Sequence, residues 1–163
     1  MALNSLKDVY IDQLQDMYSA CKQSIEATTK LGQASSDDKL GKALAAGSAG
    51  IAEGMEKLEK IASDHGFDPN GEFCKGMEGL VKEAHAHALD EEFGSDAARD
   101  AMIITQYLRM VHYALAGYGV CVVYANRLNL DGDAALLHEC LKKTEDGHES
   151  MMGIAREGVG AND

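Results

Sequence analysis

The stretch from residue 100 to residue 129 constrains the fold most. Its apolar residues recur at three- and four-residue steps, which is the period of an α-helix, and no proline interrupts it. A helix of about 30 residues spans roughly 45 Å at 1.5 Å per residue. So long an apolar face is stable in water only if other helices pack along it, so the stretch predicts a helical bundle. The face consists of Ile103, Ile104, Tyr107, Leu108, Val111, Leu115, Tyr118, Cys121 and Val122.

Further helices are predicted around this one, with boundaries at glycine, proline, serine and aspartate clusters. They cover approximately residues 5–31, 36–65, 71–89 and 133–157, and the tail 158–163 is expected to fray. The helix at 71–89 is short, and as a crossover it lets the helices on either side run in the directions of a ferritin-like bundle. Residues 1–163 are expected to form a single domain.

Composition narrows the range of partners. The formal net charge is -12 at pH 7 and the sequence pI is about 4.8, so the surface should repel nucleic acid and anionic membranes. No apolar run is expected to reach the roughly 20 residues that span a bilayer, and the first residues lack the features of a signal peptide. A cytoplasmic location is therefore expected, in which the scattered cysteines stay reduced and mostly buried. These are Cys21, Cys74, Cys121 and Cys140.

Segments along most of the chain carry a family resemblance. They read LKDVYIDQLQDMYSACKQ from Leu6, CKGMEGLVKEA from Cys74, VHYALAGYG from Val111 and LLHECLKKTEDG from Leu136. Together they resemble the ferritin-like YciE/YciF family of bacterial stress-associated proteins. The resemblance implies an all-α, antiparallel four-helix bundle with an additional short helix. It also implies a homodimer and, in typical members, a metal site of carboxylates and histidine in the bundle centre.

The positions that carry this metal site in typical members differ here. Cys21 stands where the family has glutamate, and Gly47, Ala49 and Gly50 stand where it has a histidine and glutamates. Val111 and Ala114 replace the two glutamates that flank the position of His112, and the last helix reads Leu-Lys-Lys-Thr where the family is acidic. Alanine, valine and glycine cannot bridge two iron ions, so a standard di-iron centre is not expected and no cofactor follows from the sequence.

The block AAGSAG at residues 45–50 lies inside a predicted helix. Each of its two glycines costs about 1 kcal/mol relative to alanine, which indicates a packing or ligand requirement. In one interpretation the helices close up, or tyrosines and methionines fill the centre. In the other, the centre is a pocket for a small organic ligand, which would satisfy buried tyrosine hydroxyls. The predicted pocket residues are Tyr18, Cys21, Gly47, Gly50, Tyr107, Val111, Ala114 and Tyr118.

A rebuilt metal centre is the alternative to the pocket. Glu145 and His148 have the i, i+3 spacing that places a carboxylate and an imidazole on one helix face, and His112 or Cys21 would be their partners. Against this, the neighbouring lysines also fit an exposed polar segment. A third option is a metal-free enzyme with Cys21 as nucleophile or redox thiol.

The function predicted first is a stress-associated binding or structural bundle that lacks the standard di-iron site. The alternative is a metal-dependent oxidoreductase using Glu145 and His148, acting on oxygen or peroxide. The sequence contains neither a glycine-rich phosphate-binding loop nor the Ser, His and Asp order of a catalytic triad, so no motif identifies a reaction. The ligand, whether a metal ion or an organic molecule, is left open by the sequence.

Overall fold

The computed structural model of this chain describes residues 3–159 and consists of helices. They are α1 (Leu6–Ala34), α2 (Asp38–His65), α3 (Lys75–Ala84), α4 (Asp96–Arg127) and α5 (Asp131–Glu157), and a π-helical turn, η1 (His85–Leu89), follows α3 directly. No strand occurs within residues 3–159. The predicted all-α class is confirmed.

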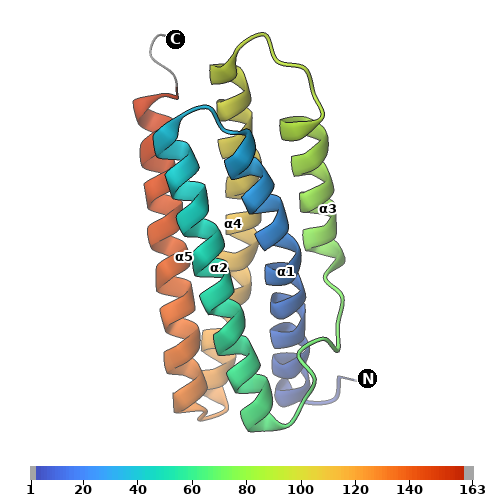
Figure 1. The fold of residues 1–163 in the computed structure, drawn as a ribbon. Helices are drawn as coiled ribbons and strands as arrows, with labels where there is room; N and C mark the ends of the chain where they lie inside the picture. Colours follow the sequence, from blue (N-terminus) through green and yellow to red (C-terminus); the bar gives the residue numbers. More distant parts are fainter. Residues whose placement is uncertain (1–2, 160–163) are drawn as a thin grey trace.

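The four long helices form a square in which each packs against two neighbours. α1 packs on α2 and α4, and α5 completes the square by packing on the same two helices. Adjacent helices run antiparallel, so α2 and α4 are diagonal and run in the same direction (Figure 1). α3 lies outside the square, against α1 and α4, and returns the chain to the end where α4 begins (Figure 1). This is the predicted ferritin-like bundle with an additional short helix.

Side-chain caps define most helix starts. The side chains of Ser5, Asp37 and Ser95 each accept a hydrogen bond from a backbone N–H in the first turn of α1, α2 and α4. Cys74 caps α3 through its sulfur, and Gly66 ends α2 with a positive φ of 70°. These are the positions at which short polar residues and glycine relieve the unpaired backbone groups of helix ends.

Some predicted boundaries shift. α1 continues to Ala34, so Gly32 lies within the helix and does not end it. A Cβ added at Gly32 would lie 3.4 Å from the Cβ of Leu44 in α2. α2 begins at Asp38, α3 begins at Lys75 after the cap at Cys74, and α5 begins at Asp131. Of the predicted frayed tail 158–163, residues 160–163 lie outside the described residues.

α4 is the core helix that the sequence predicts, but one expectation about it is wrong. By length and composition alone, α4 passes the test for a helix that crosses a membrane. A helix that packs on three others in a bundle must be apolar on several faces, so this test is weak evidence for a membrane span. Inside the bundle its side chains contribute to two apolar clusters, one toward each end.

Candidate ligand site

A cavity of about 410 Å³ lies between α1, α2, α4 and α5, and Met77 of α3 also contributes to its lining. Its lining extends along α2 from Ala43 to Lys57, which is about 21 Å of helix at 1.5 Å per residue. The cavity is therefore an elongated slot, and its volume falls within the range of about 300–1,000 Å³ that is typical of small-molecule sites. The lining includes all but one of the predicted pocket residues, namely Cys21, Gly47, Gly50, Tyr107, Val111, Ala114 and Tyr118.

Tyr18 is the predicted pocket residue that lies elsewhere. Its hydroxyl donates a hydrogen bond of 2.6 Å to Glu59, and this bond is the main reason why the pKa of Tyr18 rises to about 12. Tyr18 is not in the lining, and its bond to Glu59 places its hydroxyl at an exposed position of α2, beyond the end of the cavity at Lys57.

Two glycines of α2 make room for tyrosines that reach across the bundle from α4. A Cβ added at Gly47 would lie 2.5 Å from the hydroxyl oxygen of Tyr107, and one added at Gly54 would lie 2.8 Å from that of Tyr118. The two hydroxyls therefore occupy space that larger α2 side chains would need. The tyrosines fill part of the bundle centre, and the cavity is the part that they leave.

The hydroxyls of Thr28 and Tyr107 lie at the end of the cavity toward the α1–α2 loop, and that of Thr28 is buried without a partner in the described part of the chain. Thr28 is fully buried, and its Oγ1 has no hydrogen-bond partner within residues 3–159. Burial alone raises the pKa of Tyr107, with no contribution from a hydrogen bond. A buried polar group without a partner costs about 1–3 kcal/mol, so a molecule that offers a hydrogen bond here gains that free energy on binding.

At the other end of the cavity, sulfur atoms surround the Tyr118 hydroxyl. Cys21 Sγ lies 3.4 Å from this oxygen, and Cys140 lines the same end of the cavity. Burial raises the pKa of the Cys21 thiol to about 11. At neutral pH the thiol is therefore protonated, which argues against the prediction of Cys21 as a nucleophile because the thiolate is the reactive form.

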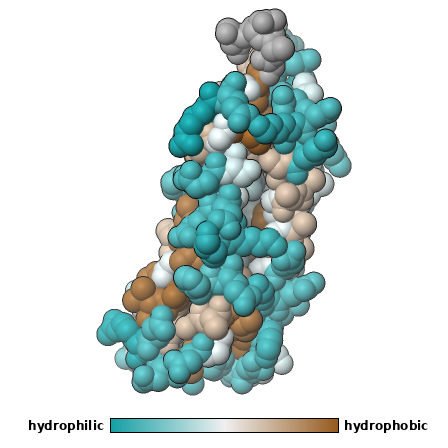
Figure 2. Space-filling view, turned by 90° about the vertical axis from the view of Figure 1, so that its left-hand side faces the viewer, coloured by the Kyte–Doolittle hydropathy of each residue, from teal (hydrophilic) through white to brown (hydrophobic). Residues whose placement is uncertain are grey.

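The mouth of the cavity lies between α2 and α5 and is bordered by charged residues. Lys143 of α5 pairs with Glu53 of α2, and Lys57 of α2 pairs with Glu139 of α5 at 2.7 Å. The face on the α5 side of the molecule is mainly hydrophilic, in keeping with this border (Figure 2). All four side chains are at least a quarter exposed, so each pair contributes little free energy and can open at low cost.

The donor groups of the cavity do not fit the di-iron centre that the family resemblance implies. Such a centre needs carboxylates that converge from facing helices. The carboxylates of the lining are Glu53 and Asp146, which lie at the mouth and pair with lysines, whereas the interior offers hydroxyls and thiols. Within residues 3–159, no three His, Cys, Asp or Glu side chains form a group suited to a metal ion.

The predicted metal ligands lie outside the cavity lining. His112 of α4 and His148 of α5 face each other, with 3.2 Å between their Nε2 atoms. Glu145 is exposed and does not join them in a group of three ligands. The structure thus brings the two histidines together and leaves the carboxylate apart.

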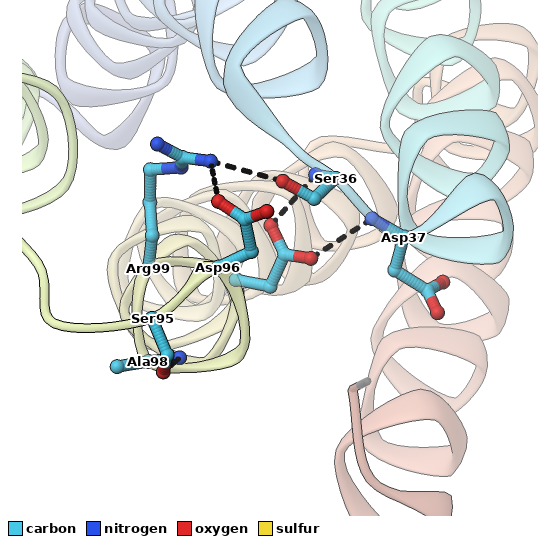
Figure 3. Close-up of polar contacts among 7 residues, drawn as sticks. Ser36, Asp37, Ser95, Asp96, Ala98 and Arg99 are labelled. Carbon is cyan, nitrogen blue, oxygen red and sulfur yellow. Dashed lines mark hydrogen bonds and ion pairs between the residues drawn. The ribbon is translucent and has the colours of Figure 1, made fainter. Parts of the chain in front are cut away.

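Sequence reasoning missed the carboxylate that fixes the start of α2. Asp100 of α4 is 1% exposed, and its two oxygens accept hydrogen bonds of 2.9 Å from the backbone N–H groups of Ser36 and Asp37. Beside it, Arg99 donates to Ser36 and Asp96 (Figure 3). The sequence offers one indication of this contact, namely that an aspartate, Asp100, stands next to the apolar face of the predicted helix.

A second buried carboxylate fixes the end of α2. Asp133 of α5 accepts a hydrogen bond of 2.9 Å from the Tyr10 hydroxyl and lies 2.7 Å from His65 Nε2. This contact joins the last turn of α2 to the first turn of α5 and to α1. Since the partners come from three helices, no local pattern in the sequence could indicate it.

Comparisons with known proteins show which family the sequence matches. The model of a family described as a domain of unknown function, DUF892, matches residues 5–162. Protein YciF of Escherichia coli strain K12 is 32% identical over 144 residues, which cover 88% of this chain and 86% of that protein.

Solved structures have the same architecture. The crystal structure of the E. coli stress protein YciF has a TM-score of 0.89 and 29% sequence identity, and the match covers 95% of this chain and 97% of that one. YcfI from Rhodopseudomonas palustris has a TM-score of 0.87 at 23% identity, covering 93% and 95% of the two chains. The second likeness is one of fold alone.

Proposed function

This chain belongs to the DUF892 family, and we propose that it is a ligand-binding bundle whose cavity holds a small, mainly apolar organic molecule. The observation that carries the proposal is the elongated cavity itself, with the buried hydroxyl of Thr28, unsatisfied among the described residues, in its lining and the hydroxyl of Tyr107 at the same end. The ligand is an elongated molecule with a hydrogen-bonding group at that end and an apolar body along the slot.

The size of the cavity supports an occupant. Its volume of about 410 Å³ lies in the range of small-molecule sites, and its mouth gives a molecule a way in from solvent. Water fills a cavity well only where it finds two to four polar partners. Much of this lining is apolar, including Met17, Met77, Met110 and Met151, so an organic molecule fits the middle of the slot better than water does.

The proposal also covers the role, the assembly and the location of the chain. A part in the stress response is proposed from the likeness to the E. coli stress protein YciF. A homodimer in the cytoplasm is proposed from the family resemblance and from the acidic surface. The metal-dependent oxidoreductase built on Glu145 and His148 is less well supported, since neither residue lines the cavity.

Native mass spectrometry of gently purified protein tests the proposal directly. The expected result is an organic adduct that denaturation releases, together with the mass of a dimer. As a defined probe, 8-anilinonaphthalene-1-sulfonate should fluoresce on binding to protein stripped of this adduct. Gly50→Leu should reduce probe affinity at least tenfold, because a Cβ at this position meets only the Lys143 side chain at 3.5 Å and the larger group projects into the slot.

A matched variant controls for the added leucine. Gly79 is an exposed residue of α3, and a Cβ there has nothing within 4 Å, so Gly79→Leu should leave probe affinity unchanged. Tyr107→Phe should weaken the natural adduct, whereas Tyr18→Phe, outside the cavity, should not. Absence of any adduct, combined with equal probe binding in Gly50→Leu and wild type, would contradict the proposal.

A further inference from the structure

Two histidines meet on the seam between α4 and α5, away from the cavity. His112 of α4 and His148 of α5 have ring centroids 4.8 Å apart and perpendicular ring planes, and their Nε2 atoms are separated by 3.2 Å. His112 is exposed and the His148 side chain is 21% exposed, so solvent reaches the pair. Neither residue lines the cavity.

The separation of the two nitrogens matches metal ligation. In a tetrahedral site with Zn–N bonds of about 2.0–2.1 Å, two ligand nitrogens lie about 3.3–3.4 Å apart. Two Nε2 atoms that both carry protons would repel each other at 3.2 Å, so at least one presents a lone pair toward the other. A pair poised in this way requires only a small rearrangement to place both lone pairs on one ion.

A carboxylate lies beside one of the two rings. His148 Nδ1 is 3.3 Å from the Glu149 carboxylate. A carboxylate that accepts from the second ring nitrogen is the usual partner of a metal-bound histidine, and Glu149 is near enough to take this role when Nε2 binds an ion. Glu145 precedes His148 by three positions and shares its helix face.

We propose that His112 and His148 form a two-imidazole site for one divalent transition-metal ion, such as Zn²⁺, Cu²⁺ or Ni²⁺, on the solvent side of the α4–α5 seam. Within residues 3–159 no third ligand side chain joins the pair, so water or a reoriented Glu145 carboxylate completes the coordination. Imidazole ligands favour these ions over Mg²⁺ and Ca²⁺. The ion would join α4 to α5, and the site is independent of any ligand in the cavity.

Metal titration of the full chain without an affinity tag tests this site. Calorimetry with ZnCl₂ should give one ion per chain, and His112→Ala and His148→Ala should each weaken binding at least tenfold. His138→Ala is the matched control, because this histidine is also exposed on α5 and should leave binding unchanged. Excess Mg²⁺ should not compete.

The electron paramagnetic resonance spectrum of bound Cu²⁺ supplies a second readout. Coupling to two imidazole nitrogens is expected in the wild type and to one in each single variant. Wild-type affinity in either variant, an equal loss in His138→Ala, or one ion shared between two chains would overturn the proposal. Far-ultraviolet circular dichroism verifies that the variants are folded, which is expected because both side chains are solvent-accessible.

Discussion

The α1–α4 seam and the α2–α5 seam lie on opposite sides of the bundle, and both contain glycine, but with opposite consequences. In the α1–α4 seam, a Cβ added at Gly117 would lie 2.0 Å from Met17 Sδ, so this glycine permits close packing. In the α2–α5 seam, Gly50 has only the Lys143 side chain nearby, at 3.5 Å. The first glycine closes its seam, whereas the second leaves space that becomes part of the cavity.

The polar contacts of the two seams differ as well: the α1–α4 seam is closed by hydrogen bonds, and the α2–α5 seam is bridged by ion pairs at the surface. The Tyr113 hydroxyl of α4 donates to Asp16 of α1 at 2.7 Å and accepts from the Cys74 thiol, so α3 covers the α1–α4 seam. Exposed ion pairs bridge the α2–α5 seam. α2 can border an open slot because Asp100 fixes its start and Asp133 fixes its end. Because both ends of α2 are held by buried carboxylates, its middle can stay loosely packed beside the cavity.

Alkaline pH should reduce the free energy of unfolding more than any substitution below. It compares a thiol at the cavity with a thiol in the packed core. Burial raises the pKa of Cys21, at the cavity, to about 11 and that of Cys121, in the core, to about 12, from an ordinary value of 9.0. The folded chain holds these protons more tightly, so the stability they contribute is present below pH 9 and lost as the pH rises through 11–12. Between pH 8 and pH 10.5 each thiol should remove about 2 kcal/mol from the free energy of unfolding.

Urea unfolding at both pH values measures this loss. Cys21→Ala and Cys121→Ala should each make the pH dependence less steep by a similar amount. If only Cys121→Ala does so, water reaches Cys21 through the open seam and the cavity is wetter than its lining indicates.

Gly117→Val tests the closed seam. The added atoms collide with the end of the Met17 side chain, which must turn toward the cavity that it lines, so the free energy of unfolding should fall by about 2 kcal/mol. Chemical denaturation at pH 7.5 measures the change. Gly119→Val on the same helix, where a Cβ has nothing within 4 Å, is the control, and an equal loss there would show that helix propensity rather than packing is responsible.

Asp100→Ala tests whether a fixed end holds the open seam in place. Removing the carboxylate leaves two backbone N–H groups of the α1–α2 loop without their acceptor, so we expect a loss of about 2 kcal/mol. Hydrogen exchange should become faster in the first turns of α2 and remain unchanged in α3. A uniform acceleration over the whole chain would contradict a local role.

Gly50→Ala should produce the smallest change, in the opposite direction. Helix propensity favours alanine by about 1 kcal/mol, and the new methyl group meets the Lys143 side chain at an ordinary contact distance. The midpoint of thermal unfolding should therefore rise by a few degrees. A decrease would mean that the seam closes more tightly in solution and would remove the contrast with Gly117.

The sequence predicts most of the architecture, because helical periodicity and capping are local properties. The uninterrupted apolar period of α4 and the cap at Ser95 are visible without a structure. The pocket was predicted from the AAGSAG block and the missing carboxylates, and the cavity lies beside that block. Tyr18 was predicted to line the pocket but does not, because a helical period alone does not determine which edge of an inward face borders a cavity. Glu145 was predicted as a metal ligand from its spacing to His148, but this spacing does not bring it together with the two histidines.

The sequence by itself determined that the chain is a helical bundle and where most of its helices begin and end. Only the tertiary structure decided which glycine closes a seam and which opens one, and that His112 and His148 meet. The physical reason is that helix formation depends on neighbours within a few residues. Cavities and polar pairs depend instead on side chains from different helices, such as Gly47 and Tyr107 on the diagonal of the bundle.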